Sequence, residues 1–145
     1  MCGRYVAVAD RSKIERQFEA RPIDGEALAP DFNVAPTKKV YAVMDRHDER
    51  ELKIVRWGLI PSWAKDPKIG SRMINARLES ASSKPSFRAA WKKRRALIPA
   101  DGYYEWYAPE VGPDSPAKPA KQPYYIHPRD GSLMSMAGLY EIWRD

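Results

Sequence analysis

Short runs of strand-forming residues recur along this 145-residue chain, and prolines or turn signals separate them. The runs with strand character cover residues 2–9, 40–44, 52–57, 96–98, 103–107, 124–127 and 133–143, and a charged turn over 45–51 joins the second to the third. Helices are expected from a cap at Asp10 or Ser12 to about residue 20, and over residues 86–93. Many short strands with few helices predict an α+β fold that is mainly antiparallel and barrel-like.

Length and composition narrow the class of protein. The chain is long enough for one modest core, so residues 1–145 are expected to form a single domain. One cysteine excludes an intramolecular disulfide framework and suits a reducing cytosol, so we expect a cytoplasmic protein, nucleoid-associated if bacterial. Neither a secretory leader nor an apolar run of about 18 residues is found, so no membrane partner is expected. Zinc-like spacing and a Gly-rich phosphate loop are also missing, so no metal and no cofactor are expected.

Positive charge is concentrated in one part of the chain. The net charge of +6 is compatible with a polyanionic partner, and residues 84–95 contain six cations and no acid. The cations are Lys84, Arg88, Lys92, Lys93, Arg94 and Arg95. Five tryptophans add rings on which nucleic-acid bases could stack. On composition alone, a solvated helix face and core aromatics explain the same pattern.

Cys2 is the only cysteine and directly follows the initiator Met1. Methionine aminopeptidases remove Met1 when the next side chain is small, which would leave Cys2 with a free amine and a thiol on adjacent carbons. Both groups are nucleophilic near neutral pH, because their reference pKa values are about 7.7–8.0 and about 8.5. Such a pair converts an aldehyde to an imine and then to a thiazolidine ring, and it can also attack acyl groups. The structural alternative is a small apolar residue that opens a strand.

Glu105 is the candidate proton acceptor for this nucleophile. It shares a face of the predicted strand 103–107 with Tyr103 and Tyr107. A carboxylate that is desolvated among aromatic rings suits general acid/base catalysis. An exposed Glu on an edge strand is the structural alternative.

Asn75, Arg77 and Arg4 could hold the electrophile. An amide such as that of Asn75 can bind a sugar hydroxyl or carbonyl, and a guanidinium such as that of Arg77 can bind a phosphate through two hydrogen bonds. Arg4 lies two residues from Cys2 and is expected on the same strand face. A turn Asn and surface cations are the ordinary interpretation of these residue types.

Six blocks of sequence follow one another along the chain. They are Met-Cys-Gly-Arg (1–4), Asn-Val-Ala-Pro-Thr (33–37), Arg-Trp-Gly-Leu-Ile-Pro-Ser-Trp (56–63), Ile-Asn-Ala-Arg-Leu-Glu (74–79), Leu-Ile-Pro-Ala-Asp-Gly-Tyr-Tyr-Glu-Trp (97–106) and Ala-Gly-Leu-Tyr-Glu (137–141). Together they resemble the SOS-response-associated peptidase (SRAP) family, whose members shield abasic sites in single-stranded DNA. Any one block is weak evidence, but six in order make the resemblance specific across essentially the whole chain.

The resemblance implies a reaction and a set of site residues. Cys2, after removal of Met1, attacks the C1′ aldehyde of a ring-opened abasic deoxyribose and forms a stable thiazolidine DNA–protein crosslink. Asn75 holds the opened sugar, and Glu105 handles the proton transfers. The residues implied to bind DNA are Arg4, Asn33, Trp63, Arg77, Lys84 and Arg88. The crosslink would protect the lesion from cleavage and error-prone bypass, a function in the repair of DNA damage.

The chain also departs from the family. Family members continue past the last block into further strands and a His that assists strand nicking and crosslink reversal, and neither His47 nor His127 lies in a corresponding motif. Because the chain ends at Asp145 straight after a strand-like run, we expect a C-terminal truncation, with the missing segment or a second fragment as a partner. The basic run offers Lys84 and Arg88 but no cation at position 85.

Two other functions are compatible with the sequence. The Cys2 thiol could serve an N-terminal-Cys peptidase with autoprocessing activity, through a thioester or acyl intermediate, although no Cys-His arrangement is evident. A truncated chain could instead bind single-stranded DNA without a covalent bond. The activity class is accordingly DNA–protein crosslinking, with lyase or thiol peptidase activity as the alternatives.

Overall fold

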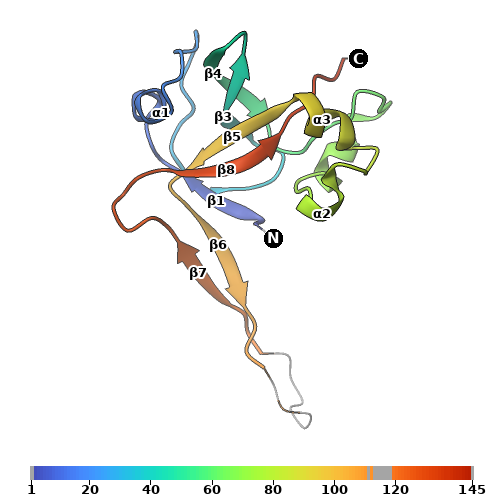
Figure 1. The fold of residues 1–145 in the computed structure, drawn as a ribbon. Coiled ribbons are helices and arrows are strands. Elements are labelled where there is room, and N and C mark those ends of the chain that lie inside the picture. Colours follow the sequence, from blue (N-terminus) through green and yellow to red (C-terminus); the bar gives the residue numbers. More distant parts are fainter. Residues whose placement is uncertain (1, 111, 113–118, 145) are drawn as a thin grey trace.

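Two four-stranded antiparallel sheets form the framework of the residues that the computed structural model describes, 2–110, 112 and 119–144. The first sheet has the strand order β2-β1-β6-β7 and the second has the order β4-β3-β5-β8 (Figure 1). The strands are β1 (Arg4–Ala7), β2 (Asp31–Val34), β3 (Lys39–Arg46), β4 (Glu49–Arg56), β5 (Arg95–Ala100), β6 (Gly102–Tyr107), β7 (Gln122–Ile126) and β8 (Met134–Leu139). The helices are α1 (Arg11–Phe18), the 3₁₀ helix η1 (Pro67–Arg72), α2 (Leu78–Ala81) and α3 (Arg88–Lys93). The predicted α+β, mainly antiparallel fold is confirmed.

The chain passes back from the second sheet to the first at Asp101. β5 and β6 are consecutive, yet they lie in different sheets, so Asp101-Gly102 turns a corner and does not close a hairpin. The Asp101 carboxylate fixes this corner, because its Oδ2 accepts hydrogen bonds from the backbone N–H of Val8 (2.8 Å) and of Ala9 (3.0 Å). Over the described residues each sheet keeps two edge strands, so the barrel-like arrangement is not closed.

One cluster of the core lies where α1 covers the second sheet. Ile14 and Phe18, four residues apart on α1, are buried against Tyr41, Val43 and Leu52 of the β3–β4 hairpin, as their spacing predicts. Asp10 is the N-cap, since its carboxylate accepts a hydrogen bond of 2.7 Å from the backbone N–H of Lys13. The helix ends at Phe18, two residues before the expected end, because Glu19 adopts a left-handed conformation with φ 50°.

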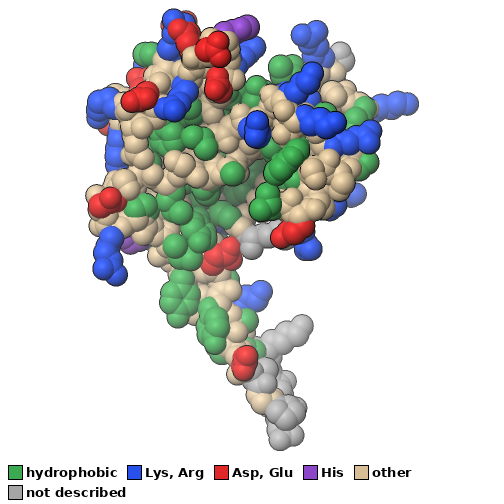
Figure 2. Space-filling view, viewed as in Figure 1, with side chains coloured by type: hydrophobic (Ala, Val, Ile, Leu, Met, Phe, Trp, Pro, Cys, Tyr) green, Lys and Arg blue, Asp and Glu red, His purple; other side chains and the backbone are tan. Residues whose placement is uncertain are grey.

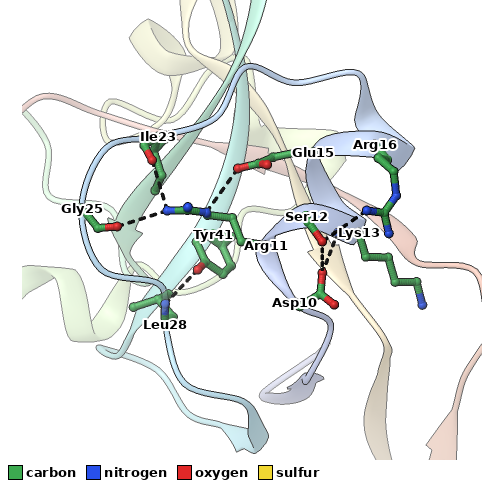
Figure 3. A network of polar contacts seen from close by, with 10 residues as sticks. All are labelled: Asp10, Arg11, Ser12, Lys13, Glu15, Arg16, Ile23, Gly25, Leu28 and Tyr41. Atoms are coloured by element: carbon green, nitrogen blue, oxygen red, sulfur yellow. Dashed lines mark hydrogen bonds and ion pairs between the residues drawn. The ribbon is translucent and has the colours of Figure 1, made fainter.

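A network of polar contacts holds the irregular segment 22–30 beside α1 (Figure 3). Arg11 Nη1 donates hydrogen bonds to the carbonyl oxygens of Ile23 and Gly25, each at 3.1 Å, and Arg11 Nε forms an ion pair of 3.3 Å with Glu15. The backbone N–H of Leu28 donates to the hydroxyl of the buried Tyr41 at 2.8 Å. These contacts fix the approach of the chain to β2, a strand that the sequence analysis missed.

Several predicted boundaries are wrong for identifiable reasons. The charged residues 45–51 are not a long turn: β3 and β4 continue through them, and only His47 and Asp48, at φ 55° and 62°, form a tight hairpin turn. The predicted strand 133–143 ends at Leu139, after which the backbone N–H of Tyr140 donates to the Arg94 carbonyl. The segment 108–121 between β6 and β7 contains four prolines and predicts an irregular surface excursion, and its residues 111 and 113–118 lie outside the described residues.

The predicted helix 86–93 begins only at Arg88, because turns occupy the residues before it. Spacing by four residues predicts a buried face with Phe87 and Trp91 and an exposed face with Arg88 and Lys92. Both faces are confirmed: Phe87 is buried and Trp91 half-buried, whereas Arg88 and Lys92 are exposed. Among the described residues, no helix has both the length and the apolar character needed to cross a membrane.

Candidate functional site

Cys2 lies just before β1, at the margin of a core cluster that contains Tyr5, Val34 and Val40. Its thiol is partly buried and donates a weak hydrogen bond of 3.4 Å to the Arg4 carbonyl oxygen. Burial raises the pKa of the Cys2 thiol above its usual value, and the negative charge of Glu105 also acts to raise it. The thiol is therefore held mainly in its protonated form near neutral pH.

We expect this raised pKa to slow alkylation of Cys2 in the folded protein. The thiolate is the reactive form, and a raised folded-state pKa means that it forms only as the pH rises above the range in which an unfolded-chain thiol ionises. Because the chain has one cysteine, intact mass after iodoacetamide treatment reports Cys2 alone. The midpoint of the rate–pH profile should be higher for the folded protein than for the same protein in denaturant. Equal midpoints would contradict this prediction.

Asn75 reaches Cys2 from a distant part of the chain. It lies in the segment between η1 and α2, and its Nδ2 donates a hydrogen bond of 2.7 Å to the Cys2 carbonyl oxygen across 73 positions of sequence. This contact fixes the main chain of Cys2 directly beside its amine. The other amide atom, Oδ1, accepts no hydrogen bond from the described residues, so it is available to a bound ligand.

β6 places Glu105 beside the start of β1. The antiparallel register pairs Arg4 with Tyr104, and its continuation by one pair sets Gly3 opposite Glu105. Glu105 is partly buried, and its charge acts on the Cys2 thiol. Alternation along β6 gives Tyr103, Glu105 and Tyr107 one face, as predicted.

Arg4 is held by β2 on the other side of β1. Its Nη1 donates a hydrogen bond of 3.0 Å to Asn33 Oδ1 of β2, and this contact orients the guanidinium toward β2. The structure thus gathers five of the predicted site residues around the start of β1: Cys2, Arg4, Asn33, Asn75 and Glu105. We call them the Cys2 cluster.

The other four predicted site residues lie on the surrounding surface. Trp63 is 58% exposed in the loop after β4, Arg77 is the N-cap of α2, Lys84 lies between α2 and α3, and Arg88 begins α3. The three cations are exposed, and no hydrogen bond or ion pair between described residues joins these four side chains to the Cys2 cluster. Figure 2 shows Lys and Arg side chains gathered on the side of the molecule that carries α2 and α3. This basic face is distinct from the acidic and apolar side chains at the base of the β6–β7 hairpin.

The β6–β7 hairpin carries exposed aromatic residues that sequence reasoning did not single out. The hairpin extends the first sheet away from the rest of the molecule (Figure 1), and hydrophobic side chains follow it (Figure 2). Trp106, Tyr107 and Tyr124 are each about half exposed, at 45%, 56% and 54%. The aromatic residues in 103–107 and 124–125 were the sequence signal for this surface. Alternation along each strand did not show that side chains on both faces of the hairpin are accessible to solvent. Within the described part of the chain, no three His, Cys, Asp or Glu side chains lie close enough together to hold a metal ion.

Comparisons with known proteins agree over the whole chain. Residues 1–145 match the family model described as SOS response associated peptidase (SRAP). The chain is 41% identical over 145 residues to the abasic site processing protein YoqW of Bacillus subtilis (strain 168), covering 99% of this chain and 61% of that protein. It is 33% identical over 147 residues to the abasic site processing protein YedK of Escherichia coli (strain K12), covering 96% of this chain and 59% of that protein. The X-ray crystal structure of a protein from Bacteroides thetaiotaomicron matches with a TM-score of 0.81 at 27% identity, covering 99% of this chain and 62% of that one. The chain thus spans about three fifths of the length of these relatives.

Proposed function

The chain belongs to the SOS response associated peptidase (SRAP) family, and we propose that it captures abasic sites in single-stranded DNA as a covalent adduct on Cys2. The observation that carries the proposal is the meeting of Cys2, Asn75 and Glu105 from three separate segments. A nucleophile, a group that can hold the substrate and a proton acceptor are the components that such a reaction needs. The names of two relatives, both abasic site processing proteins, support the choice of lesion.

The proposed reaction begins at the amine of Cys2 after removal of Met1. The amine adds to the C1′ aldehyde of the ring-opened deoxyribose, and loss of one water molecule gives an imine. The Cys2 sulfur then attacks the imine carbon, and the thiol proton is transferred to the nitrogen as the thiazolidine ring closes. One C–N bond and one C–S bond form at C1′, and one water molecule is the only product released.

The place of Glu105 opposite Gly3, next to the nucleophile, gives it a specific task in this scheme. The thiol must lose its proton as the sulfur attacks, so a carboxylate close enough to influence it electrostatically is suited to accept that proton and to pass it to the ring nitrogen. Asn75 would accept a hydrogen bond from a sugar hydroxyl through Oδ1 while Nδ2 keeps the Cys2 main chain in place.

The DNA backbone would be held by the surrounding cations. Arg4 lies in the Cys2 cluster, and the exposed Arg77, Lys84 and Arg88 could neutralise phosphates without reading sequence. The exposed ring of Trp63 could stack on a base next to the lesion. Single-stranded DNA suits this surface, because an unpaired strand leaves its bases free to stack.

We expect the protein, with removal of Met1 verified by intact mass, to form a heat-stable adduct with single-stranded DNA that carries one abasic site. A denaturing gel would show the adduct as a shifted band. DNA without the lesion, and abasic DNA first reduced with borohydride so that the aldehyde is an alcohol, should give no band. A band with the reduced DNA would refute aldehyde capture. Folded protein that binds the abasic DNA but gives no band would show the non-covalent alternative.

A further inference from the structure

We propose that Trp57 is a positioning residue that holds Asn75 against Cys2, an inference that rests on the proposed function only for its effect on reaction rate. Trp57 lies directly after β4, far from Cys2 and Asn75 in sequence. Its indole Nε1–H donates a hydrogen bond of 2.8 Å to the carbonyl oxygen of Ile74, the residue immediately before Asn75. The indole therefore fixes the peptide unit from which the Asn75 side chain extends.

Trp57 is itself fixed at both its backbone and its ring. Its backbone N–H donates to the Lys38 carbonyl and its carbonyl accepts from the Thr37 N–H, each at 2.9 Å, so the residue is held against the segment that joins β2 to β3. Its ring meets the ring of Tyr5 edge to face, with centroids 5.5 Å apart and planes inclined at 62°. Tyr5 is a buried residue of β1, the strand that follows Cys2. The indole is therefore anchored to the same strand as the nucleophile.

These contacts form a closed path around the site. From Cys2 the path runs along the chain to Tyr5, through the ring contact to Trp57, through the indole hydrogen bond to Ile74, and back through the Asn75 amide to the Cys2 carbonyl. A hydrogen bond of 2.7 Å from a side-chain amide requires its backbone to be placed within a few tenths of an ångström. The Ile74 carbonyl has one side-chain donor among the described residues, the Trp57 indole, so removing that donor should release the Asn75 backbone.

Trp57→Phe tests this path because it keeps an aromatic ring beside Tyr5 and removes only the indole donor. In the protein without DNA, we expect the Asn75 side-chain amide signals in a ¹⁵N NMR spectrum to shift and broaden in this variant. Trp91→Phe is the matched control: Trp91 is a partly buried indole of α3 outside the Cys2 cluster. Its replacement should leave the Asn75 signals unchanged. Unchanged Asn75 signals in folded Trp57→Phe protein would overturn the inference.

The wild-type protein provides a measurement that does not depend on a variant's folding. The Trp57 indole N–H should exchange with solvent slowly because the Ile74 carbonyl accepts it, and fast exchange would overturn the inference. In crosslinking assays Trp57→Phe should slow adduct formation by about tenfold with little change in DNA affinity. The slowing should vanish when Asn75 is already Ala, because both changes would act through one amide, and additive losses would contradict positioning. If the wild-type protein forms no adduct, the proposed function fails, while the NMR and exchange results still decide the role of Trp57.

Discussion

Cys2→Ala protein is expected to give no heat-stable adduct with abasic DNA, a loss that we place at more than about a hundredfold. Alanine is also small, so Met1 is still removed and a free amine remains at position 2. That amine can form the imine, but without sulfur the ring cannot close, and the imine is hydrolysed when the sample is heated. Covalent product without a reductant in this variant would contradict the thiazolidine mechanism.

A reductant separates the roles of the amine and the thiol. Cyanoborohydride reduces an imine to a stable secondary amine, so it should restore a covalent band in Cys2→Ala and also in Cys2→Ser. Serine can close only an oxazolidine, which is far less stable than a thiazolidine, so Cys2→Ser should need the reductant as well. A form with two further residues before Cys2 has no free amine at Cys2. That form should lose both the thiazolidine product and any trapping at this residue.

The peptidase alternative makes a different prediction for the same variants. An acyl-enzyme mechanism needs the thiol but no aldehyde, so it would show cleavage of a peptide that depends on Cys2 and needs no DNA. The proposed reaction gives a bond to C1′ and no peptide cleavage. Peptide cleavage and DNA adduct formation can therefore be measured independently on the same set of variants.

Local sequence patterns predicted those features of the fold that depend on interactions between residues close in sequence. The Asp10 cap, the buried pair Ile14 and Phe18, and the two faces around Phe87 and Trp91 all follow from helical geometry and are confirmed. The strand β2 was missed because its Asp-Phe-Asn-Val sequence has only two residues that favour strands. It becomes a strand through its pairing with β1, which no local pattern encodes.

Residue chemistry indicated Cys2, Glu105 and Asn75 one by one, but only the resemblance joined them in one site, for a related reason. The hydrogen bond between Asn75 and Cys2 spans 73 positions, and periodicity carries no information about contacts at that distance. The corner at Asp101 is another case: Asp-Gly is a typical turn sequence, but it does not show that β5 and β6 belong to different sheets. Trp57 was seen only as part of a motif, since its partner is a backbone carbonyl that a sequence does not reveal.

Gly58→Ala is expected to cause the largest loss of stability among single substitutions near the site. Gly58 has a φ of +119°, and an added Cβ would lie 2.5 Å from the Gly70 carbonyl oxygen and 3.0 Å from its carbon. Because both neighbours are backbone atoms, no side-chain rotation can relieve the clash. We expect the free energy of unfolding, from urea denaturation, to fall by about 3–5 kcal/mol through combined backbone strain and overpacking.

Gly25→Ala separates the two causes of this loss. Gly25 also has a positive φ, +102°, but an added Cβ there would meet nothing within 4 Å, so its replacement should cost only the strain, about 1–2 kcal/mol. Equal losses in the two variants would show that the approach of Gly58 to Gly70 is not a tight contact. The distinction bears on the site, because Gly58 follows Trp57 and Gly70 lies in η1, shortly before Asn75. If the contact is tight, Gly58→Ala protein that remains folded should also form the DNA adduct more slowly, whereas Gly25→Ala should leave its rate unchanged.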